Sequence, residues 1–308
     1  MFLVCGEALM DVFAEQETSS GVVLDARVGG SPFNVAIGLA RLGQPVAFFG
    51  GLSKGFLGDR LRKALTAEHV DIGYCPLVDA PTTLGLVGLA ADGSASYAFY
   101  GTGCADRMVT ADDLPDLGDD IRALHFGSYA TVVEPVASAQ RLLVERERGR
   151  RLIAYDPNLR LNVEPNLERW KEMTTWMASR AHVIKVSSED LHLAFPGVAI
   201  HEVAAGWLRS GCRLVIVTKG GSGVAGFTDA AEIEVDARPV DVVDTVGAGD
   251  TFQAALLTWL SEHALLSIEA VGSLDGDQLR LALEFASTAA SITCTRRGAD
   301  LPRRVEVV

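Results

Sequence analysis

The sequence has few basic residues for its length. Its 308 residues include 27 Lys and Arg against 40 Asp and Glu, which gives a formal net charge of −13. Proteins hold the phosphate backbone of nucleic acids largely through Lys and Arg, and no basic run in this sequence offers that contact. The composition therefore argues against a nucleic-acid partner. An anionic substrate would have to be met by local hydrogen-bond donors.

Paired cysteines and long apolar runs are also missing. The five cysteines stand singly, without a CxxC pair or a His at metal-ligand spacing, so the sequence predicts neither a disulfide framework nor a zinc site. No run reaches the roughly 18 apolar residues that cross a bilayer. The N-terminal stretch MFLVCGEALMDVF lacks the basic segment of a signal peptide and favours a first β-strand. We therefore expect a cytoplasmic protein with no membrane partner.

The better-known phosphate-binding and kinase motifs are absent as well. The sequence contains no GxxxxGK[ST] loop, no HRD and no DFG. Gly221-Ser-Gly223-Val-Ala-Gly226 satisfies GxGxxG, but such a loop should open a helix, whereas VAGFTDAAEIEVDA is typical of further strand. We interpret this match as accidental.

Short apolar runs alternate with amphipathic stretches along the chain. The strand-like runs lie near residues 3, 46, 123, 151, 182 and 213. Helical patterns cover about 33–42, 57–68, 134–149, 166–179, 201–210, 249–263 and 276–292. This alternation predicts an α/β fold with a doubly wound, mostly parallel sheet covered on both faces. No linker or internal repeat divides the chain, so we expect a single domain over residues 1–308.

Two segments interrupt the alternation. Residues 12–28 and 82–100 are typical of strands joined by turns, the second with a turn at Ala91-Asp92-Gly93-Ser94, and neither is followed by a helix of its own. We expect them to form a small antiparallel sheet that stands off the main one. A lid formed by about 12–28 and 82–105 is the functional interpretation, and an ordinary extension of the main sheet is the alternative.

Residues 244–250 read DTVGAGD and directly precede a helical pattern. Gly247, Ala248 and Gly249 are therefore expected at a helix N-terminus, where unpaired N–H groups and the helix dipole form an anion hole for a phosphoryl group. Asp250, in the first turn, is placed to accept the proton of an attacking hydroxyl. The alternative is a carboxylate that only complements the helix dipole.

Two N-terminal stretches carry further polar groups. GGSPFN at 29–34 precedes another helical pattern, and GEALMD at 6–11 follows the first strand and ends in an acid. Asp11, Asn34 and the backbone of Gly30 are hydrogen-bond partners suited to sugar hydroxyls.

Four motifs together resemble the ribokinase-like, or PfkB, family of carbohydrate kinases. They are GGSPFN, DPNLR at 156–160, TKGGSG at 218–223 and DTVGAGDTF, and the resemblance covers nearly the whole chain. It implies a ribokinase-like α/β/α sandwich with a β-sheet lid that often mediates a homodimer. It also implies transfer of the γ-phosphoryl group of ATP, accompanied by Mg²⁺, to a sugar hydroxyl.

The resemblance also implies roles for individual positions. Asp250 would be the general base, beside an anion hole at 247–249, and Asp11, Gly30 and Asn34 would bind the sugar. The nucleotide site would be lined by Ser187, Thr218, Gly220 and Gly223.

The resemblance implies two cation sites. At the first, the role of Asp244 has an alternative, and at the second, two carboxylates are candidates. Asp244 and Val246 match positions that often help bind a monovalent cation such as K⁺, and an Asx turn that orders the loop is the alternative role for Asp244. Many members carry Asn-x-x-Glu where this sequence has Ser187 and Asp190. The Mg²⁺-organising role therefore falls to Asp190 or to the adjacent Glu189.

A resemblance to bacterial fructokinases limits the choice of acceptor sugar. It implies sugar-pocket roles for Tyr100, Arg107 and Arg160. The leading expectation is phosphorylation of fructose to fructose 6-phosphate. The alternative is a kinase for 2-keto-3-deoxygluconate, another ketose or a nucleoside, because an arginine can also pair with a carboxylate. A catalytically silent sugar- or nucleotide-binding regulator is a third possibility, against which the carboxylate of Asp250 argues.

Overall fold

Each of the six predicted strand-like runs forms a strand of one central sheet in the computed structural model, which describes residues 1–89 and 95–308. The strand order is β14-β13-β12-β11-β10-β9-β1-β4. The six predicted strands are parallel, and β13 and β14 are antiparallel additions at one edge. The bounds are β1 Phe2–Cys5, β4 Val46–Phe49, β9 Ala123–Gly127, β10 Leu152–Asp156, β11 Val183–Ser187, β12 Leu214–Thr218, β13 Val224–Phe227 and β14 Glu232–Val235.

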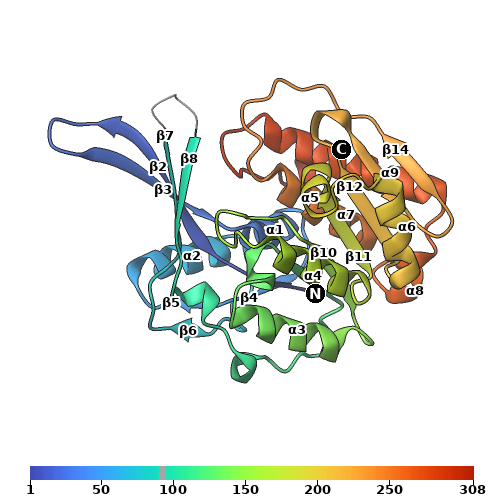
Figure 1. Ribbon diagram of the computed structural model, residues 1–308, viewed down its shortest axis with the longest axis horizontal. Coiled ribbons are helices and arrows are strands. Elements are labelled where there is room, and N and C mark those ends of the chain that lie inside the picture. Colours follow the sequence, from blue (N-terminus) through green and yellow to red (C-terminus); the bar gives the residue numbers. More distant parts are fainter. Residues whose placement is uncertain (90–94) are drawn as a thin grey trace.

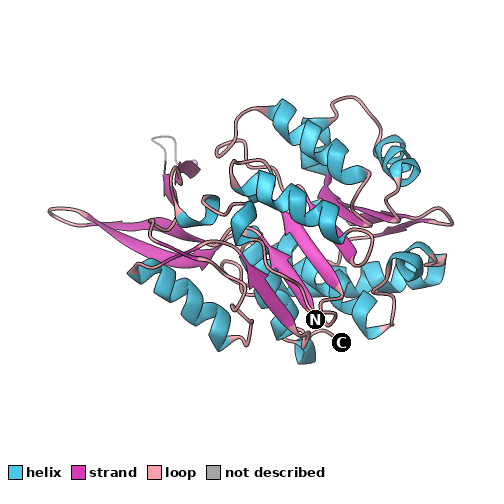
Figure 2. Ribbon diagram, turned by 90° about the horizontal axis from the view of Figure 1, so that it is seen from below, coloured by secondary structure: helices cyan, strands magenta, loops and turns pink. Residues whose placement is uncertain are grey.

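Helices cover both faces of this sheet, as predicted (Figure 2). One layer contains α1 (Ser31–Arg41), α7 (Ala248–Glu262) and α9 (Gly276–Cys294), and the other contains α3 (Val136–Glu147), α4 (Leu167–Ala178) and α6 (Ile200–Ser210). Helix α2 (Phe56–Ala67) matches the remaining predicted helix. Two short helices were not predicted, α5 (Ser188–Ala194) and α8 (Ile268–Gly272). Within the described residues no helix combines the length and apolar character needed to span a membrane.

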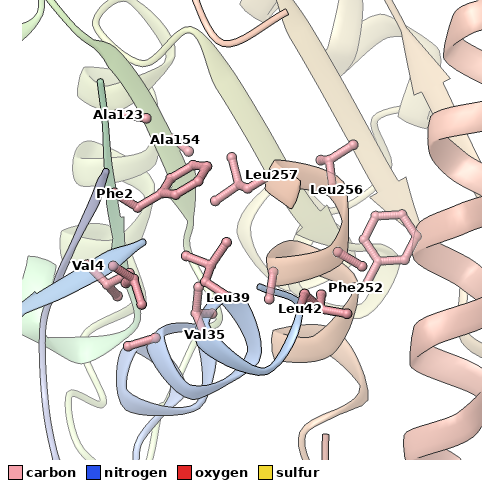
Figure 3. Close-up of a cluster of buried hydrophobic side chains, with 14 of the residues drawn as sticks. Phe2, Val4, Val35, Leu39, Leu42, Ala123, Ala154, Phe252, Leu256 and Leu257 are labelled. Atoms are coloured by element: carbon pink, nitrogen blue, oxygen red, sulfur yellow. The ribbon is translucent and has the colours of Figure 1, made fainter. Parts of the chain in front are cut away.

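The alternation of side chains along each strand supplies both helix layers with apolar contacts. In β1, Phe2 and Val4 belong to the hydrophobic core under α1 and α7, whereas Leu3 and Cys5 belong to the core on the opposite face. Figure 3 shows the first of these cores, in which side chains of α1 and α7 meet Phe2. This packing holds the N-terminal ends of α1 and α7 close to the carboxyl edge of the sheet.

A second sheet stands apart from the main body (Figure 1). Its order is β3-β2-β7-β8, with β2 Leu9–Glu17, β3 Val22–Gly29, β7 Leu84–Leu89 and β8 Ala95–Tyr100. The predicted turn at 91–94 lies outside the described residues. The expectation of a wholly antiparallel sheet was wrong, because β2 and β7 pair in parallel, with Met10 opposite Leu84. The two hairpins are joined by a long connection that contains α2, so no tight turn forces their central strands to run in opposite directions.

Candidate active site

A cavity of about 670 Å³ lies between the two sheets. Its wall includes the residues that end or follow five parallel strands of the main sheet, among them Glu7, Ser128, Asn158, Ser187 and Thr218. The second sheet contributes Asp11, Phe13, Val87 and Phe99. Doubly wound sheets bind ligands at the carboxyl ends of their strands, where the connecting loops diverge. The cavity occupies that position.

Helix α7 begins at this cavity. Its N-cap is Gly247, which has a φ of 78°, and a β-carbon there would lie 2.7 Å from that of Ala299. Only glycine adopts this conformation without strain. Gly247 and Gly249 line the cavity, but the N–H of Ala248 already donates to the carbonyl of Thr245 at 3.2 Å. Within the described residues, the N–H groups left to form the predicted anion hole are therefore those of Gly247 and Gly249, and not that of Ala248.

Asp250 is held in the first turn of α7 by two donors from the start of α1. Its side chain is buried, its Oδ1 accepts a hydrogen bond from Ser31 Oγ at 2.6 Å, and its Oδ2 accepts one from Asn34 Nδ2 at 2.8 Å. Burial raises the pKa of this carboxyl, and the two hydrogen bonds and nearby Lys185 oppose the rise. A fixed carboxylate with a raised pKa, on the wall of a cavity, is suited to accept a proton from a bound hydroxyl.

The predicted sugar-binding residues Asp11, Gly30, Asn34 and Arg160 all line the cavity. Gly30 has a φ of 109°, and a β-carbon there would lie 2.8 Å from the carbonyl oxygen of Glu7. The pKa of Asp11 is raised to about 6, because the effect of burial exceeds the opposing effect of Arg160. Asn34 differs from the prediction, because its amide nitrogen donates to Asp250 Oδ2.

The predicted nucleotide-binding residues come from the ends of β11 and β12 and from the turn that follows β12. Ser187, Thr218 and Gly220 line it, whereas Gly223 lies in the adjacent turn and its N–H donates to the carbonyl of Gly220. Ser187 is the N-cap of α5, and its hydroxyl accepts from the N–H of Asp190 at 3.0 Å.

Both candidate Mg²⁺ carboxylates, Glu189 and Asp190, line the cavity next to Ser187. The pKa of Asp190 is raised to about 6, first by burial and then by Asp156.

Two predicted sugar-pocket residues, Tyr100 and Arg107, are not among the described residues that line the cavity. Tyr100 is 61% exposed, and the preceding Phe99 lines the cavity instead, because successive side chains of a strand face opposite ways. Arg107 lies over the ring of Tyr129, 5.1 Å from its centroid, and Tyr129 is a wall residue. Arg107 thus supports the wall from behind.

Asp244 orders the loop before α7. Its Oδ1 accepts from the N–H of Val246 at 3.1 Å, which closes an Asx turn, and its Oδ2 accepts from the N–H of Gly298 at 2.8 Å. The structure therefore contains the turn that the sequence offered as the alternative role. Val246 lines the cavity, and Asp244 is not among the described wall residues.

Two charged residues of the cavity wall, Lys185 and Glu7, lie outside the motifs that predicted the site. Lys185 is 4% exposed, and its Nζ lies 2.7 Å from Oδ2 of the buried Asp156. Glu7 is 1% exposed, and burial raises its pKa to about 8. A signal for both existed in the sequence: each is a charge within or just after an apolar strand, where a buried ion needs a partner or a ligand.

These features define a class of enzyme. A buried carboxylate beside free N–H donors at a helix N-terminus, in an α/β cleft, suits transfer of a phosphoryl group to a hydroxyl. The chain belongs to the pfkB family of carbohydrate kinases, whose family model matches residues 1–305.

Relatives of known sequence cover most of the chain. A fructokinase from Rhizobium leguminosarum bv. trifolii is 41% identical over 281 residues, which are 91% of this chain and 86% of that protein. Probable fructokinase-4 from Arabidopsis thaliana is 36% identical over 320 residues, covering 98% of this chain and 94% of that protein.

Solved structures agree with this assignment. The crystal structure of a fructokinase with bound ATP from Xylella fastidiosa has a TM-score of 0.89 and 27% identity, covering 99% of this chain and 96% of that one. An aminoimidazole riboside kinase from Salmonella enterica, complexed with aminoimidazole riboside and an ATP analog, has a TM-score of 0.80 and 26% identity. The match covers 97% of this chain and 94% of that one. The predicted family, ribokinase-like fold and carbohydrate kinase activity are confirmed.

Proposed function

We propose that this protein phosphorylates fructose with ATP to yield fructose 6-phosphate and ADP, in the cytoplasm where ATP is available. The observation that carries the proposal is the Asp250 carboxylate, held by Ser31 and Asn34 on the wall of the cavity. The fructokinase names of the Rhizobium and Xylella relatives support fructose as the acceptor.

In the proposed reaction, the oxygen of the sugar hydroxyl attacks the γ-phosphorus of ATP. A new O–P bond forms, the bond from the γ-phosphorus to the bridging oxygen breaks, and ADP leaves with that electron pair. Asp250 accepts the hydroxyl proton, and the N–H groups of Gly247 and Gly249 stabilise charge on the phosphoryl oxygens. Asp11, Gly30 and Arg160 would hold the sugar against the base.

Mg²⁺ is the proposed companion of ATP, because it neutralises the phosphate oxygens. Among the described residues, no group of three or more His, Cys, Asp or Glu side chains is placed to hold a metal. Mg²⁺ usually takes only one or two carboxylates and completes its shell with water and substrate phosphates. Glu189 and Asp190, side by side on the cavity wall, fit that requirement.

We also propose a monovalent cation such as K⁺ near Asp244 and Val246. Each carboxylate oxygen of Asp244 accepts one backbone hydrogen bond and retains acceptor capacity toward a cation. A cation there would stabilise the loop that leads into α7. We expect kcat to be higher in KCl than in a buffer whose cation is a bulky ammonium, and equal rates would exclude this site.

A homodimer through the lid is the proposed assembly. The outer strand β3 exposes Val22, Val23 and Leu24 by 45% to 50%. An exposed apolar edge strand is a ready surface for pairing with a second chain. Sedimentation should show a dimer that Val23→Lys weakens. The matched control is Leu142→Lys on α3, which should not alter the assembly.

The acceptor can be tested with a panel of sugars. The purified protein would be incubated with Mg-ATP and fructose, 2-keto-3-deoxygluconate, ribose or a nucleoside, while ADP release is followed. We expect the highest kcat/KM for fructose, with phosphate on O6 of the product. Preferential turnover of another acceptor would overturn the fructose assignment, and sugar binding without any turnover would favour a silent regulator.

A further inference from the structure

Lys185 presents a buried cation to the cavity in which the phosphoryl group would move. It lies on β11, is 4% exposed, and lines the cavity. Among the residues that the structure describes, its ammonium pairs with Asp156 Oδ2 alone, at 2.7 Å. An ammonium has three N–H donors, so two remain for other acceptors.

The ammonium also lies beside the start of α7. A β-carbon built on Gly249 would come within 3.1 Å of Lys185 Nζ, which places the charge next to the free N–H donors of the anion hole. Lysine thus adds a full positive charge to the partly positive end of a helix. An anion that enters between the ammonium and the helix end would be attracted by both.

The other charged groups around Lys185 do not occupy the two remaining N–H donors of its ammonium. Asp156 neutralises one unit of charge, and Asp250 is already bonded to Ser31 and Asn34. Beneath the site, burial lowers the pKa of His125 to about 3, so its ring is neutral and adds no competing charge. Burial raises the pKa of the wall carboxyl of Asp190, and Lys185 and Arg160 both oppose that rise, so Lys185 is not its only cationic neighbour.

We propose that Lys185 is a further catalytic residue, whose ammonium contacts the phosphoryl group in transfer from the sheet side of the anion hole. Lys185 gives up no proton in this step, since its charge stabilises the phosphoryl oxygens while the O–P bond forms and the bond to ADP breaks. Asp156 is a positioning residue that holds the ammonium in place. This inference rests on the proposed function of the cavity.

The test compares Lys185→Met, which keeps the length of the side chain, with Lys171→Met on the surface of α4. Lys171 pairs with Glu168 and is the matched control. We expect Lys185→Met to lower kcat by about 10²- to 10³-fold, as for loss of one preorganised donor, while ADP affinity measured by calorimetry stays unchanged. Lys171→Met should match the wild type. A kcat for Lys185→Met within a few-fold of wild type would overturn the proposal.

A second variant guards against a folding defect. Removing Lys185 alone leaves Asp156 buried without its partner, which is strongly destabilising. Lys185→Met/Asp156→Asn removes both charges, and we expect this folded double variant to stay as slow as the single one. Recovery of near-wild-type kcat in the double variant would show that the lysine serves only to neutralise Asp156.

The pH profile separates direct contact from an effect through Asp250. Under the proposal, the loss of kcat persists at every pH. If Lys185 acted only by lowering the pKa of Asp250, the acid limb of the Lys185→Met profile would move to higher pH and the rate would recover in alkali, which would overturn the proposal.

A binding measurement distinguishes failure of this inference from failure of the proposed function. Kinetic assays use whichever sugar the panel identifies, so a non-fructose acceptor leaves the test intact. Without sugar, we expect Lys185→Met to weaken ATP binding more than ADP binding. Equal effects on both nucleotides would overturn the contact with the transferred group.

Discussion

The cavity wall around Asp250, termed here the acceptor end, is proposed to meet the sugar. The wall around Ser187 and Thr218, together with the loop that leads into α7, is termed the nucleotide end and is proposed to meet ATP. The two ends differ in how firmly the protein holds them. At the acceptor end, Asp250 is 8% exposed with both oxygens bonded, and Glu7 and Lys185 are almost fully buried. At the nucleotide end, Val246 is 46% exposed, and residues 236–247 form no helix or strand. The groups proposed to react therefore stand on helix starts and strand ends, whereas part of the wall proposed for the nucleotide is an open loop.

The difference has a chemical reason. A proton acceptor and an anion hole act only within a few tenths of an ångström of the correct geometry, so they need a rigid frame. A nucleotide must enter and leave in each cycle, and a loop can move to admit it. Changes at the acceptor end should accordingly lower kcat, and changes at the nucleotide end should mainly raise KM for ATP.

The largest effect is expected for Asp250→Asn. The amide cannot accept the hydroxyl proton, so kcat should fall by about 10²- to 10⁴-fold in a steady-state assay. Asp277→Asn is the matched control, because Asp277 also lies in the first turn of a helix, α9, and is exposed. If both variants kept wild-type kcat, Asp250 would merely complement the helix dipole.

Glu7→Gln should change how the free energy of unfolding depends on pH, because Glu7 is a buried acid at the acceptor end. The pKa of Glu7 rises from 4.5 to about 8 on folding, because burial disfavours its charge. The folded state then binds the proton more tightly, so this contribution to stability is complete below pH 4.5 and is lost as the pH rises toward 8.

The glutamine side chain has no such loss, so Glu7→Gln should exceed the wild type in unfolding free energy at pH 9, by at most about 5 kcal/mol. Thermal unfolding from pH 5 to 9 measures the divergence. Glu202→Gln, at an exposed position of α6, should track the wild type throughout. Parallel curves for Glu7→Gln and wild type would mean that Glu7 is ionised in the folded protein.

Ser31→Ala should have a smaller effect on the same base. It removes the hydroxyl that donates to Asp250 at 2.6 Å, a charged hydrogen bond worth about 1.5–3 kcal/mol. We expect kcat to fall by about 10- to 100-fold. The acid limb of the pH–rate profile should also shift upward, because loss of a donor to the carboxylate raises the pKa of Asp250 further. Ser138→Ala on α3 serves as the control, and an unshifted profile would contradict this role of Ser31.

Val246→Ala should have the smallest effect. The side chain is partly exposed, so its truncation loses only a part of the roughly 2 kcal/mol that full burial of a valine provides. KM for ATP should rise by about 5-fold or less, with kcat and the KM for the sugar unchanged. A fall in kcat comparable with that of Ser31→Ala would remove the contrast between the two ends.

Much of the site could be predicted from local patterns. DTVGAGD before an apolar helix placed Asp250 correctly in the first turn of α7, and GGSPFN placed Gly30 and Asn34 at the start of α1. The position of Tyr100 could not be predicted in this way, because the sequence of a strand of unknown register does not determine which of two neighbouring side chains faces the cavity. Phe99 faces it.

The sequence by itself determined the main sheet and its two helix layers, since apolar periodicity is local and strong enough to specify each long element. Helices α5 and α8 are too short to show that periodicity. The parallel pairing of β2 with β7 depends on contacts between distant segments, so only the tertiary structure decided it.

The same holds for the partners of the reacting groups. Ser31 and Asp250 are 219 residues apart, and Lys185 and Asp156 are 29 apart on neighbouring strands. Hydrogen bonds of this kind depend on strand register and helix packing, which no short motif encodes. The glycine-rich helix start with its acid is a property of the sequence. The two donors that hold the acid, and the buried lysine beside it, are properties of the fold.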